Sequence, residues 1–406
     1  MMDEQNTPSR AMLVTNGMVV TPKEVIAASI AVSEGEIEAV FASEAGERER
    51  EQWLRSHPDA ECIDAAGRYV LPGLVDIHND AIEKEVQPRP NTLFPLKMSL
   101  LEFERKLPLH GITTMFHSLS LGVGLSLRGD HLLTDMVELI NSYRVERSVV
   151  RNRIHLRYEI TYLTGLPIVE QYIRERKIDY LSYMDHSPGQ GQYHKEGSFE
   201  RYVMKNQGIG PDEVKTIVEE LLVRRRQIDW EKLRQLGDLA ISRGISLASH
   251  DDDTPERVEQ SKASGVSVSE FPITLETALH AAASGLYVCV GAPNIVRGGS
   301  HDLNLRAVDA VSAGAASIIC SDYHSSSLLR AVFQLADEGI AALPSAVKLA
   351  TLHPAEACGI ADEVGSIETG KAADLIIVDR FDDHPWVART IVGGRTVYEA
   401  NTFYNN

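Results

Sequence analysis

Hydrophobic residues in this chain gather into short runs, and most of these runs end at a polar residue. Eight of them follow one another through the central part of the sequence, at residues 74–78, 112–117, 154–159, 180–186, 246–250, 266–271, 287–291 and 317–322. Segments with helical periodicity, such as 211–226 and 328–336, separate the runs. Short apolar strands that alternate with helices are typical of a parallel sheet, and eight of them predict an α/β fold, a (β/α)8 TIM-like barrel.

Both ends of the chain show a different pattern, in which apolar and polar residues alternate. Residues 11–20, 26–32, 36–41 and 61–70 precede the barrel, and residues 374–379 and 390–399 follow it. Alternation with period two indicates strands that bury one face. Since a barrel takes about 250 residues, the chain has room for a second unit. We expect residues 1–72 and 352–406 to form one small β-sandwich domain, with the barrel of residues 73–351 inserted between its parts.

Charge and cysteine content narrow the class of protein. The formal net charge of −18 argues against nucleic-acid binding, which needs a basic face. No apolar stretch approaches the length of a membrane span, and residues 1–10 are too polar for a secretory signal. The four cysteines lack CxxC spacing, which is typical of reduced thiols. We expect a cytoplasmic protein without nucleic-acid or membrane partners, for which a homodimer is one option.

Five of the eight runs supply the side chains that we take as candidate metal ligands. His78 and Asp80 lie two residues apart at the end of the first, and four later runs end at Glu159, His186, His250 and Asp322. Alternating side chains of a strand project from one face, so His78 and Asp80 are placed to bind one ion. That pair alone is weak evidence, because most strand histidines are merely hydrogen-bonded. Four further coincidences, all at the carboxyl ends where barrel chemistry gathers, favour a metal site.

The segments around these residues resemble the amidohydrolase superfamily and, within it, the PhnM family of α-D-ribose 1-methylphosphonate 5-triphosphate diphosphatases. The similar segments span nearly the whole chain, at residues 72–80, 87–90, 111–114, 155–159, 184–190, 247–252, 270–272, 291–301 and 321–323. The resemblance implies a dinuclear metal-dependent hydrolase of phosphonate catabolism. Such an enzyme cleaves a phosphoanhydride of its phosphorylated small-molecule substrate, releasing pyrophosphate and leaving the 5-phosphate on the sugar.

Within that resemblance, ligand type suggests how the metal site is divided. His78 and Asp80 would bind one ion, His186 and His250 the other, and Glu159 would bridge them. Many members of the superfamily use a carboxylated lysine as the bridge, and no lysine occurs between residues 151 and 165. The ions are expected to be zinc, with manganese or iron as alternatives, because all three accept nitrogen and oxygen ligands.

Two of these residues have further interpretations. Asp322 is expected both to bind metal and to act as the catalytic base that orients or deprotonates the attacking water. For Glu159, the structural alternative is an ion pair with Arg153 or Arg157 on the same strand.

Proteins bind phosphate groups through arginine side chains, which donate two hydrogen bonds at once, or through backbone amides. Arg89 follows the first metal motif in a proline-bracketed loop, and Arg297 precedes a Gly-Gly-Ser run. Both fit a triphosphate clamp, with Lys84 and His301 as weaker candidates. The alternative for Arg297 is a structural carboxylate partner.

Some positions depart from the family pattern. Gly191 stands where relatives commonly carry an arginine, Asp302 adds a carboxylate near the presumed anion site, and Glu85 replaces a histidine or an aromatic residue. These changes remove positive charge or add negative charge, so hydrolysis of a C–N bond in a cyclic amide, imide or N-acyl compound stays an alternative. A catalytically silent assembly protein is a third hypothesis, which retention of all the metal-type residues disfavours. Residues 189–210 suit a mobile lid as well as an ordinary surface loop.

Overall fold

The computed structural model describes residues 11–89, 92–122, 130–193, 197–207, 210–300 and 304–401. Its centre is a parallel eight-stranded sheet in which neighbours along the chain are also neighbours in space. The strands are β6 (Leu74–Asn79), β7 (Ile112–Leu121), β8 (Arg151–Glu159), β9 (Tyr180–Met184), β10 (Ser246–His250), β11 (Val268–Glu270), β12 (Tyr287–Gly291) and β13 (Ile318–Cys320). They coincide with the eight apolar runs, which confirms the predicted barrel.

Backbone hydrogen bonds join the first strand of the barrel to the segment after the last. The amide of Asp322 donates to the carbonyl of His78 at 2.9 Å, and the amide of Asp80 donates to the carbonyl of Asp322 at 2.8 Å. The ring therefore closes at its carboxyl edge, where two motifs that lie far apart in sequence are brought side by side.

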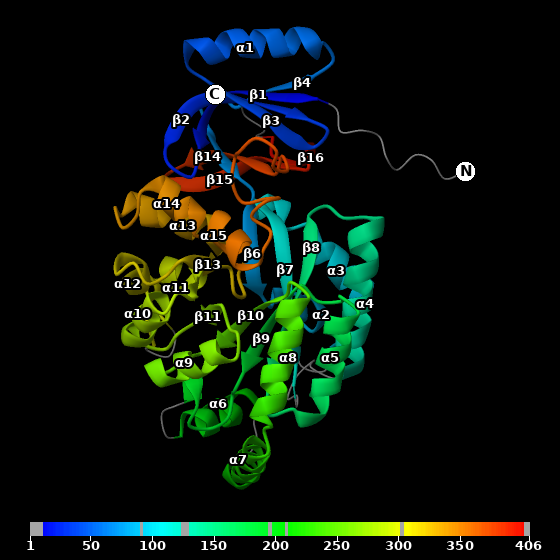
Figure 1. Ribbon diagram of the computed structural model, residues 1–406, viewed down its shortest axis with the longest axis vertical. Helices are drawn as coiled ribbons and strands as arrows, with labels where there is room; N and C mark the ends of the chain where they lie inside the picture. The colour runs from blue at the N-terminus through cyan, green and yellow to red at the C-terminus, as the bar shows by residue number, and fades with distance from the viewer. Residues whose placement is uncertain are drawn as a thin grey trace, which may run out of the picture.

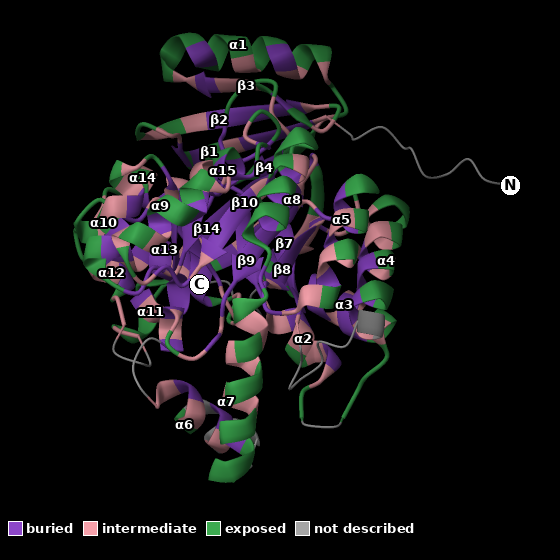
Figure 2. Ribbon diagram, turned by 60° about the horizontal axis from the view of Figure 1, so that its bottom comes forward, coloured by how far each residue is buried: buried purple, intermediate pink, exposed green. Residues whose placement is uncertain are grey.

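Helices surround the barrel because their apolar faces pack on the outward side chains of the strands. The longer ones are α4 (Asp130–Glu146), α5 (Leu166–Arg174), α8 (Trp230–Ser242), α9 (Pro255–Ala263), α10 (Leu275–Ala283) and α13 (Ser327–Asp337). Asp229, Thr254 and Thr274 begin three of them by accepting a backbone N–H bond at the N-cap. Figure 2 shows the result, buried strands inside a shell whose outer helical faces are exposed.

Shorter or peripheral helices complete the connections. They are α2 (Ala81–Val86), α3 (Leu96–Glu104), α6 (Ser198–Gln207), α7 (Pro211–Arg226), α11 (Ala292–Arg297), α12 (Ala307–Ser312), α14 (Leu343–Lys348) and α15 (Leu352–Ala357). None of the helices in the described ranges is both long enough and apolar enough to cross a membrane.

A second sheet is built from both ends of the chain, as the alternating segments predicted. Its order is β16-β15-β14-β5-β1-β2-β3, with β4 paired to β1. The strands are β1 (Met12–Val20), β2 (Val25–Ser33), β3 (Glu36–Ala42), β4 (Glu61–Asp64), β5 (Tyr69–Pro72), β14 (Leu375–Phe381), β15 (His384–Val392) and β16 (Arg395–Glu399). Antiparallel pairing of β14 with β5 joins the two halves. Apolar residues from both halves form one separate core.

Three details of this region differ from the alternating pattern. Residues 61–70 form two strands, because Ala66 and Gly67 adopt positive φ angles and turn the chain between β4 and β5. Residues 390–399 contain the turn of a hairpin at Gly393 and Gly394, which also have positive φ. Helix α1 (Ser43–Ser56), which packs on β3, was not predicted at all. In the two strand segments, a turn made by one or two residues breaks the strand, although the alternation of apolar and polar residues continues through it.

The terminal sheet lies at one end of the barrel, and α6 and α7 lie at the other (Figure 1). Arg151, at the start of β8, donates to Asp374 of the terminal segment at 2.8 Å, so the sheet adjoins the amino ends of the barrel strands. The domain bounds themselves remain predictions. Strand β5 ends at Pro72 and β6 begins at Leu74, whereas α15, which begins at Leu352, contacts β6 and β13 of the barrel.

Candidate active site

Strained backbone marks the carboxyl edge of the barrel. Asp251, Phe271 and Asp322 follow β10, β11 and β13, and their φ angles are 59°, 55° and 60°. Non-glycine residues rarely adopt this left-handed conformation, and where they do the cost is of order 1–3 kcal/mol. Here each residue is held by a backbone bond to a neighbouring strand, such as Asp251 N–H to Glu270 O at 2.8 Å. The strand ends are therefore fixed in turns that reorient the side chains after them.

The first strand and the last supply one group of predicted ligands. His78 is buried, and its ring lies 5.5 Å from that of His250 between centroids. Burial and the nearby charge of Arg157 hold the pKa of His78 well below its usual range, so its imidazole is neutral. Asp80 and Asp322 approach through the backbone bonds that close the barrel. Burial and the charge of Asp80 raise the pKa of the Asp322 carboxyl to about 7.

A second group of side chains surrounds His186, just beyond β9. Its Nδ1 lies 2.9 Å from Oε2 of Glu159, which also accepts from the Thr161 hydroxyl at 3.1 Å through its other oxygen. On the other side, His186 Nε2 lies 3.8 Å from Oδ2 of Asp251. That same carboxylate oxygen is 3.1 Å from Nδ1 of His250. His186, His250 and Asp251 thus converge closely enough to hold one ion.

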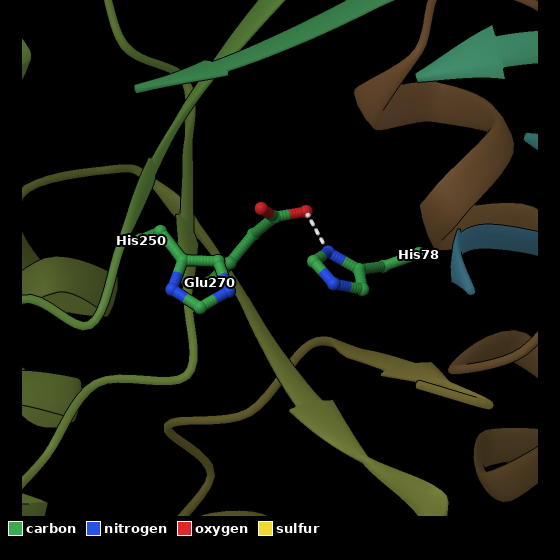
Figure 3. A group of neighbouring side chains, drawn as sticks. All are labelled: His78, His250 and Glu270. Atoms are coloured by element: carbon green, nitrogen blue, oxygen red, sulfur yellow. Dashed lines mark hydrogen bonds and ion pairs between the residues drawn. The ribbon is translucent and has the colours of Figure 1, made fainter. Parts of the chain in front are cut away.

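Glu270, the last residue of β11, is a further member of the site that the sequence reasoning did not assign. Its Oε1 lies 3.1 Å from His78 Nδ1 and accepts from the Tyr180 hydroxyl at 3.2 Å. Figure 3 shows the carboxylate turned toward His78, with His250 on the neighbouring strand. His78, His250 and Glu270 form the second cluster able to hold a cation. The signal that could have found it is its place, since Glu270 is the last polar residue of the run 266–271 and lies where the strand ends.

Arg157 was also missed as a site residue. It is only 6% exposed, and its guanidinium lies 3.4 Å from Asp80 Oδ2 and 3.2 Å from His250 Nε2. Arg153, four residues earlier, contacts Asp179 and Glu363 instead. Among the ion pairs of the described residues, Glu159 pairs with His186 and with neither arginine.

The polar atoms of this edge fit a cation. Among the described residues, Asp80 Oδ1, Asp251 Oδ2, Glu270 Oε2 and His250 Nδ1 are buried without a hydrogen bond. His250 Nδ1 and Asp251 Oδ2 face each other at ion-pair distance without hydrogen-bond geometry, as two ligands of one ion do. Buried charge that lacks partners is costly, so such atoms indicate a missing partner. Nitrogen and carboxylate donors suit zinc, manganese or iron.

A cavity of about 440 Å³ opens over this edge. Asp80, Arg157, His250, Asp251 and Asp322 line one part of it, and Lys84, Arg297 and Tyr323 line another. Two of the predicted phosphate-binding cations meet at Tyr323. Lys84 Nζ lies 5.1 Å from the centre of its ring, and Arg297 Nη1 donates to its hydroxyl at 3.5 Å. The cavity therefore has an acidic floor and a cationic side.

The remaining predicted contacts are less central. Arg89 is exposed, lies outside the residues that line the cavity, and forms an isolated β-bridge with Thr92. His301 and Asp302 lie outside the described residues. Glu85 pairs with Lys106 at 2.6 Å. These contacts leave Arg297 and Lys84 as the two predicted cations that line the cavity.

The backbone conformation explains why residue 191 is a glycine and not an arginine. Its φ angle is +50°, and a Cβ there would lie 3.0 Å from the Cβ of Asp251. An arginine at this position would strain the backbone beside the metal-type cluster. A different arginine reaches the same loop, because Arg225 of α7 donates to Asp185 at 3.0 Å and to Gln190 at 2.7 Å.

Sequence comparison identifies close similarity to characterised proteins. Residues 206–397 match the model of the amidohydrolase family. The chain is also 34% identical, over 393 residues, to the α-D-ribose 1-methylphosphonate 5-triphosphate diphosphatase of Escherichia coli (strain K12). That alignment covers 95% of this chain and 100% of the relative.

Solved structures share the architecture at much lower identity. Dihydropyrimidinase from Brevibacillus agri NCHU1002 superposes with a TM-score of 0.65 and 14% identity, covering 96% of this chain and 95% of its own. N-acetylglucosamine-6-phosphate deacetylase from Pasteurella multocida gives 0.61 and 13%, covering 96% of this chain and 100% of its own. At this identity the likeness supports the fold alone.

Proposed function

Because the chain belongs to the amidohydrolase family, we propose that it is a metal-dependent diphosphatase that hydrolyses α-D-ribose 1-methylphosphonate 5-triphosphate to pyrophosphate and the 5-phosphate. The reaction is that of the relative with which the chain shares 34% identity along nearly its whole length. The C–N hydrolases among the solved structures are 13–16% identical to this chain, which supports a shared fold and no shared activity. The loss of an arginine at Gly191 is the observation that keeps a cyclic amide as the second candidate, whereas Lys84 and Arg297 on the cavity wall favour a phosphoanhydride.

The single observation that carries this proposal is the polarity of the cavity. Three carboxylates, Asp80, Asp251 and Asp322, line its floor, whereas Lys84 and Arg297 lie together at Tyr323. A triphosphate carries several negative charges, so its terminal phosphates suit the cationic side. The phosphoryl group next to the sugar would then lie over the floor, where a cation fits. An uncharged cyclic amide would leave Lys84 and Arg297 without an anionic partner.

The assignment of ligands to two ions stays a proposal, and two groups of neighbouring side chains, which share His250, could each hold an ion. We propose His78, Asp80, Glu159, His186, His250 and Asp322 as ligands, with Asp251 and Glu270 close enough to join them. A bound pair of divalent ions supplies positive charge at the attacked phosphoryl group and acidifies water. We propose zinc for both ions, because histidine and carboxylate together suit it. A homodimer and a cytoplasmic location remain part of the proposal.

Proton transfer falls to Asp322. Its carboxylate lines the cavity with Asp80 and Asp251, where the attacking water would lie, and bound cations would keep it ionised and able to accept a proton. An Asp322 oxygen takes the proton of the attacking water as the oxygen–phosphorus bond forms. The bond from that phosphorus to the bridging oxygen breaks, and pyrophosphate leaves with the electron pair. Lys84 and Arg297 bind the leaving pyrophosphate and partly neutralise its charge.

Pyrophosphate release tests the proposal directly. Metal-replete protein is incubated with ribose 1-methylphosphonate 5-triphosphate, and ATP and dihydrouracil are assayed in parallel. We expect rapid pyrophosphate release from the first compound and no ring opening of dihydrouracil. Ring opening without pyrophosphate release, by protein that demonstrably holds metal, would establish the C–N hydrolase instead.

A further inference from the structure

The cation nearest the centre of the ligand set is Arg157. Its guanidinium contacts Asp80 at 3.4 Å and His250 at 3.2 Å, and it also lines the cavity. In the proposed site Asp80 and His250 serve different ions. Arg157 therefore lies between the two halves of the set, on the floor where the reacting phosphoryl group would be.

A purely structural role explains these contacts poorly. A buried cation is stable only when its donors are satisfied, and the loss is of order 1–3 kcal/mol for each one that is not. Within the described part of the chain, Arg157 Nε has no hydrogen-bond partner, and its carboxylate contact is long. On the same strand, Arg151 donates to Asp374 through two nitrogens, at 2.8 and 3.2 Å. Arg157 is more deeply buried and has no such paired contact with a carboxylate, so it has donor capacity left over.

The contact with His250 competes with metal binding. A guanidinium has donors only, so His250 Nε2 must be the acceptor and its lone pair points at Arg157 Nη2. The ring proton is then on Nδ1, so neither nitrogen of His250 can bind an ion while this contact lasts. An ion on Nε2 would take the lone pair itself, and an ion on Nδ1 would leave the ring proton on Nε2, so in both cases Nη2 has to turn to another acceptor. The cavity that Arg157 lines would supply one in the non-bridging oxygens of a phosphoryl group.

We propose that Arg157 is a catalytic residue, which exchanges its contact with His250 for the phosphoryl group under attack when metal and triphosphate occupy the site. This inference rests on the proposed diphosphatase function. Arg157 makes and breaks no covalent bond. It donates to the equatorial oxygens of the phosphorus while water adds and pyrophosphate leaves, as positioned arginines do in other phosphoryl transfers. Its fork binds two oxygens at once, which a lysine cannot do.

The test compares Arg157→Met and Arg157→Lys with Arg153→Met. The control removes the same side-chain type from the same strand, four residues away and outside the cavity. Metal content and metal affinity are measured by titration, inorganic phosphate affinity by calorimetry, and pyrophosphate release by kinetics. We expect Arg157→Met to keep its ions, with equal or higher affinity because Nε2 of His250 loses a competing donor. Its kcat should fall about 10³-fold or more, the range of catalytic arginines, and Arg153→Met should stay near wild type.

Chemical rescue separates a catalytic arginine from a structural one. Arg157→Ala leaves a space beside Asp80 and His250 that free guanidinium can enter, so added guanidinium should restore part of the lost rate. The added ion should not act on Arg153→Met. Arg157→Lys keeps the charge without the fork and should fall between wild type and Arg157→Met. If Arg157→Met does not fold, Arg157→Ala and Arg157→Lys still test whether Arg157 is a catalytic residue.

Two results would overturn the role of Arg157. Loss of metal in step with loss of turnover would make it a residue that only positions ligands, and wild-type kinetics in Arg157→Met would remove it from the reaction. The proposed function fails separately, if wild-type protein releases no pyrophosphate from the triphosphate. In that event the calorimetric arm decides, because equal affinity of metal-loaded wild type and Arg157→Met for inorganic phosphate would also exclude Arg157 from phosphate binding.

Discussion

The two ends of strand β8 carry arginines in opposite circumstances. At the amino end, Arg151 binds Asp374 through two donors and Arg153 contacts Asp179 and Glu363. At the carboxyl end, Arg157 has one long carboxylate contact, one histidine contact and a buried Nε without a hydrogen bond among the described residues. Arg151 at the amino end therefore has a close, two-donor carboxylate partner, and Arg157 at the carboxyl end does not.

This difference between the two ends of β8 indicates which of two cavities is the reaction site. The amino end borders the larger cavity, about 870 Å³, lined by Arg144, Arg151, Arg153 and Asp179. Its arginines already have acidic partners, so an anion would have to displace them. The smaller cavity, about 440 Å³, lies over unsatisfied carboxylates and a histidine. Unpaired buried polar atoms, which cost stability, identify the reactive end better than volume does.

The largest effect is expected from Asp322→Asn at the carboxyl end. An amide cannot take the proton of the attacking water, so kcat should fall about 10³-fold while most of the metal stays bound. Steady-state kinetics with metal analysis of the same sample checks this. Turnover near wild type in a metal-replete variant would remove Asp322 as the base.

The same substitution should stabilise the metal-free protein at alkaline pH. Burial raises the pKa of the Asp322 carboxyl to about 7 from 3.8, so between these values the folded state holds a proton that the unfolded state has lost. Stability therefore falls as pH rises through this window, and the full penalty applies above pH 7. It reaches roughly 4 kcal/mol at most, because one pKa unit is worth about 1.4 kcal/mol. After chelation of metal, Asp322→Asn should have a higher Tm than wild type at pH 8 and the same Tm at pH 3.5. An equal Tm at pH 8 would contradict the destabilising effect of the ionised Asp322 carboxylate.

Arg297→Ala should act on binding more than on chemistry. Arg297 donates to Tyr323 on the cationic side of the cavity, so its loss should raise KM for the triphosphate about 10- to 100-fold, equivalent to about 1–3 kcal/mol. The change in kcat should be small. Arg174→Ala, which removes an exposed cation paired with Glu170 on α5, is the control. An unchanged KM would mean that Arg297 has a structural role.

Asp374→Asn tests the amino end of β8, where Asp374 is the carboxylate partner of Arg151. Asp374 accepts from Arg151 and from the amide of Gly393, so the substitution should lower stability by about 1–3 kcal/mol. Turnover should change less than twofold, because the terminal sheet adjoins the end of the barrel that lies away from the ligands. Melting curves and kinetics on one sample separate the two effects. A large loss of turnover in the folded variant would erase the contrast between the two ends.

The barrel could be predicted because each strand repeats one pattern, an apolar run that ends at a polar residue. Counting the apolar runs also predicted on which barrel strand each candidate ligand lies. Glu159 ends the third barrel strand and His186 follows the fourth, as expected from the count of runs. Local pattern also gave the bounds of α7 at Pro211 and Arg226.

Partners across the barrel could not be predicted. Arg157 was considered only as a partner of Glu159, its neighbour on the strand, whereas its contacts are Asp80 and His250, 77 and 93 residues away. Glu270 contacts His78 across 192 residues. Periodicity places a side chain on a face of its own strand and says nothing of the strand opposite. Such contacts depend on the closure of the barrel, which single-sequence patterns do not encode.

The most direct test of the account is metal reconstitution. Chelated protein is titrated with zinc, and with manganese in parallel, while bound metal and pyrophosphate release from ribose 1-methylphosphonate 5-triphosphate are measured together. We predict that turnover is absent without metal, rises with occupancy and saturates at two ions per chain. Full pyrophosphate release by metal-free protein, or saturation with metal and no release, would contradict the assignment of the carboxyl end as a metal-dependent diphosphatase site.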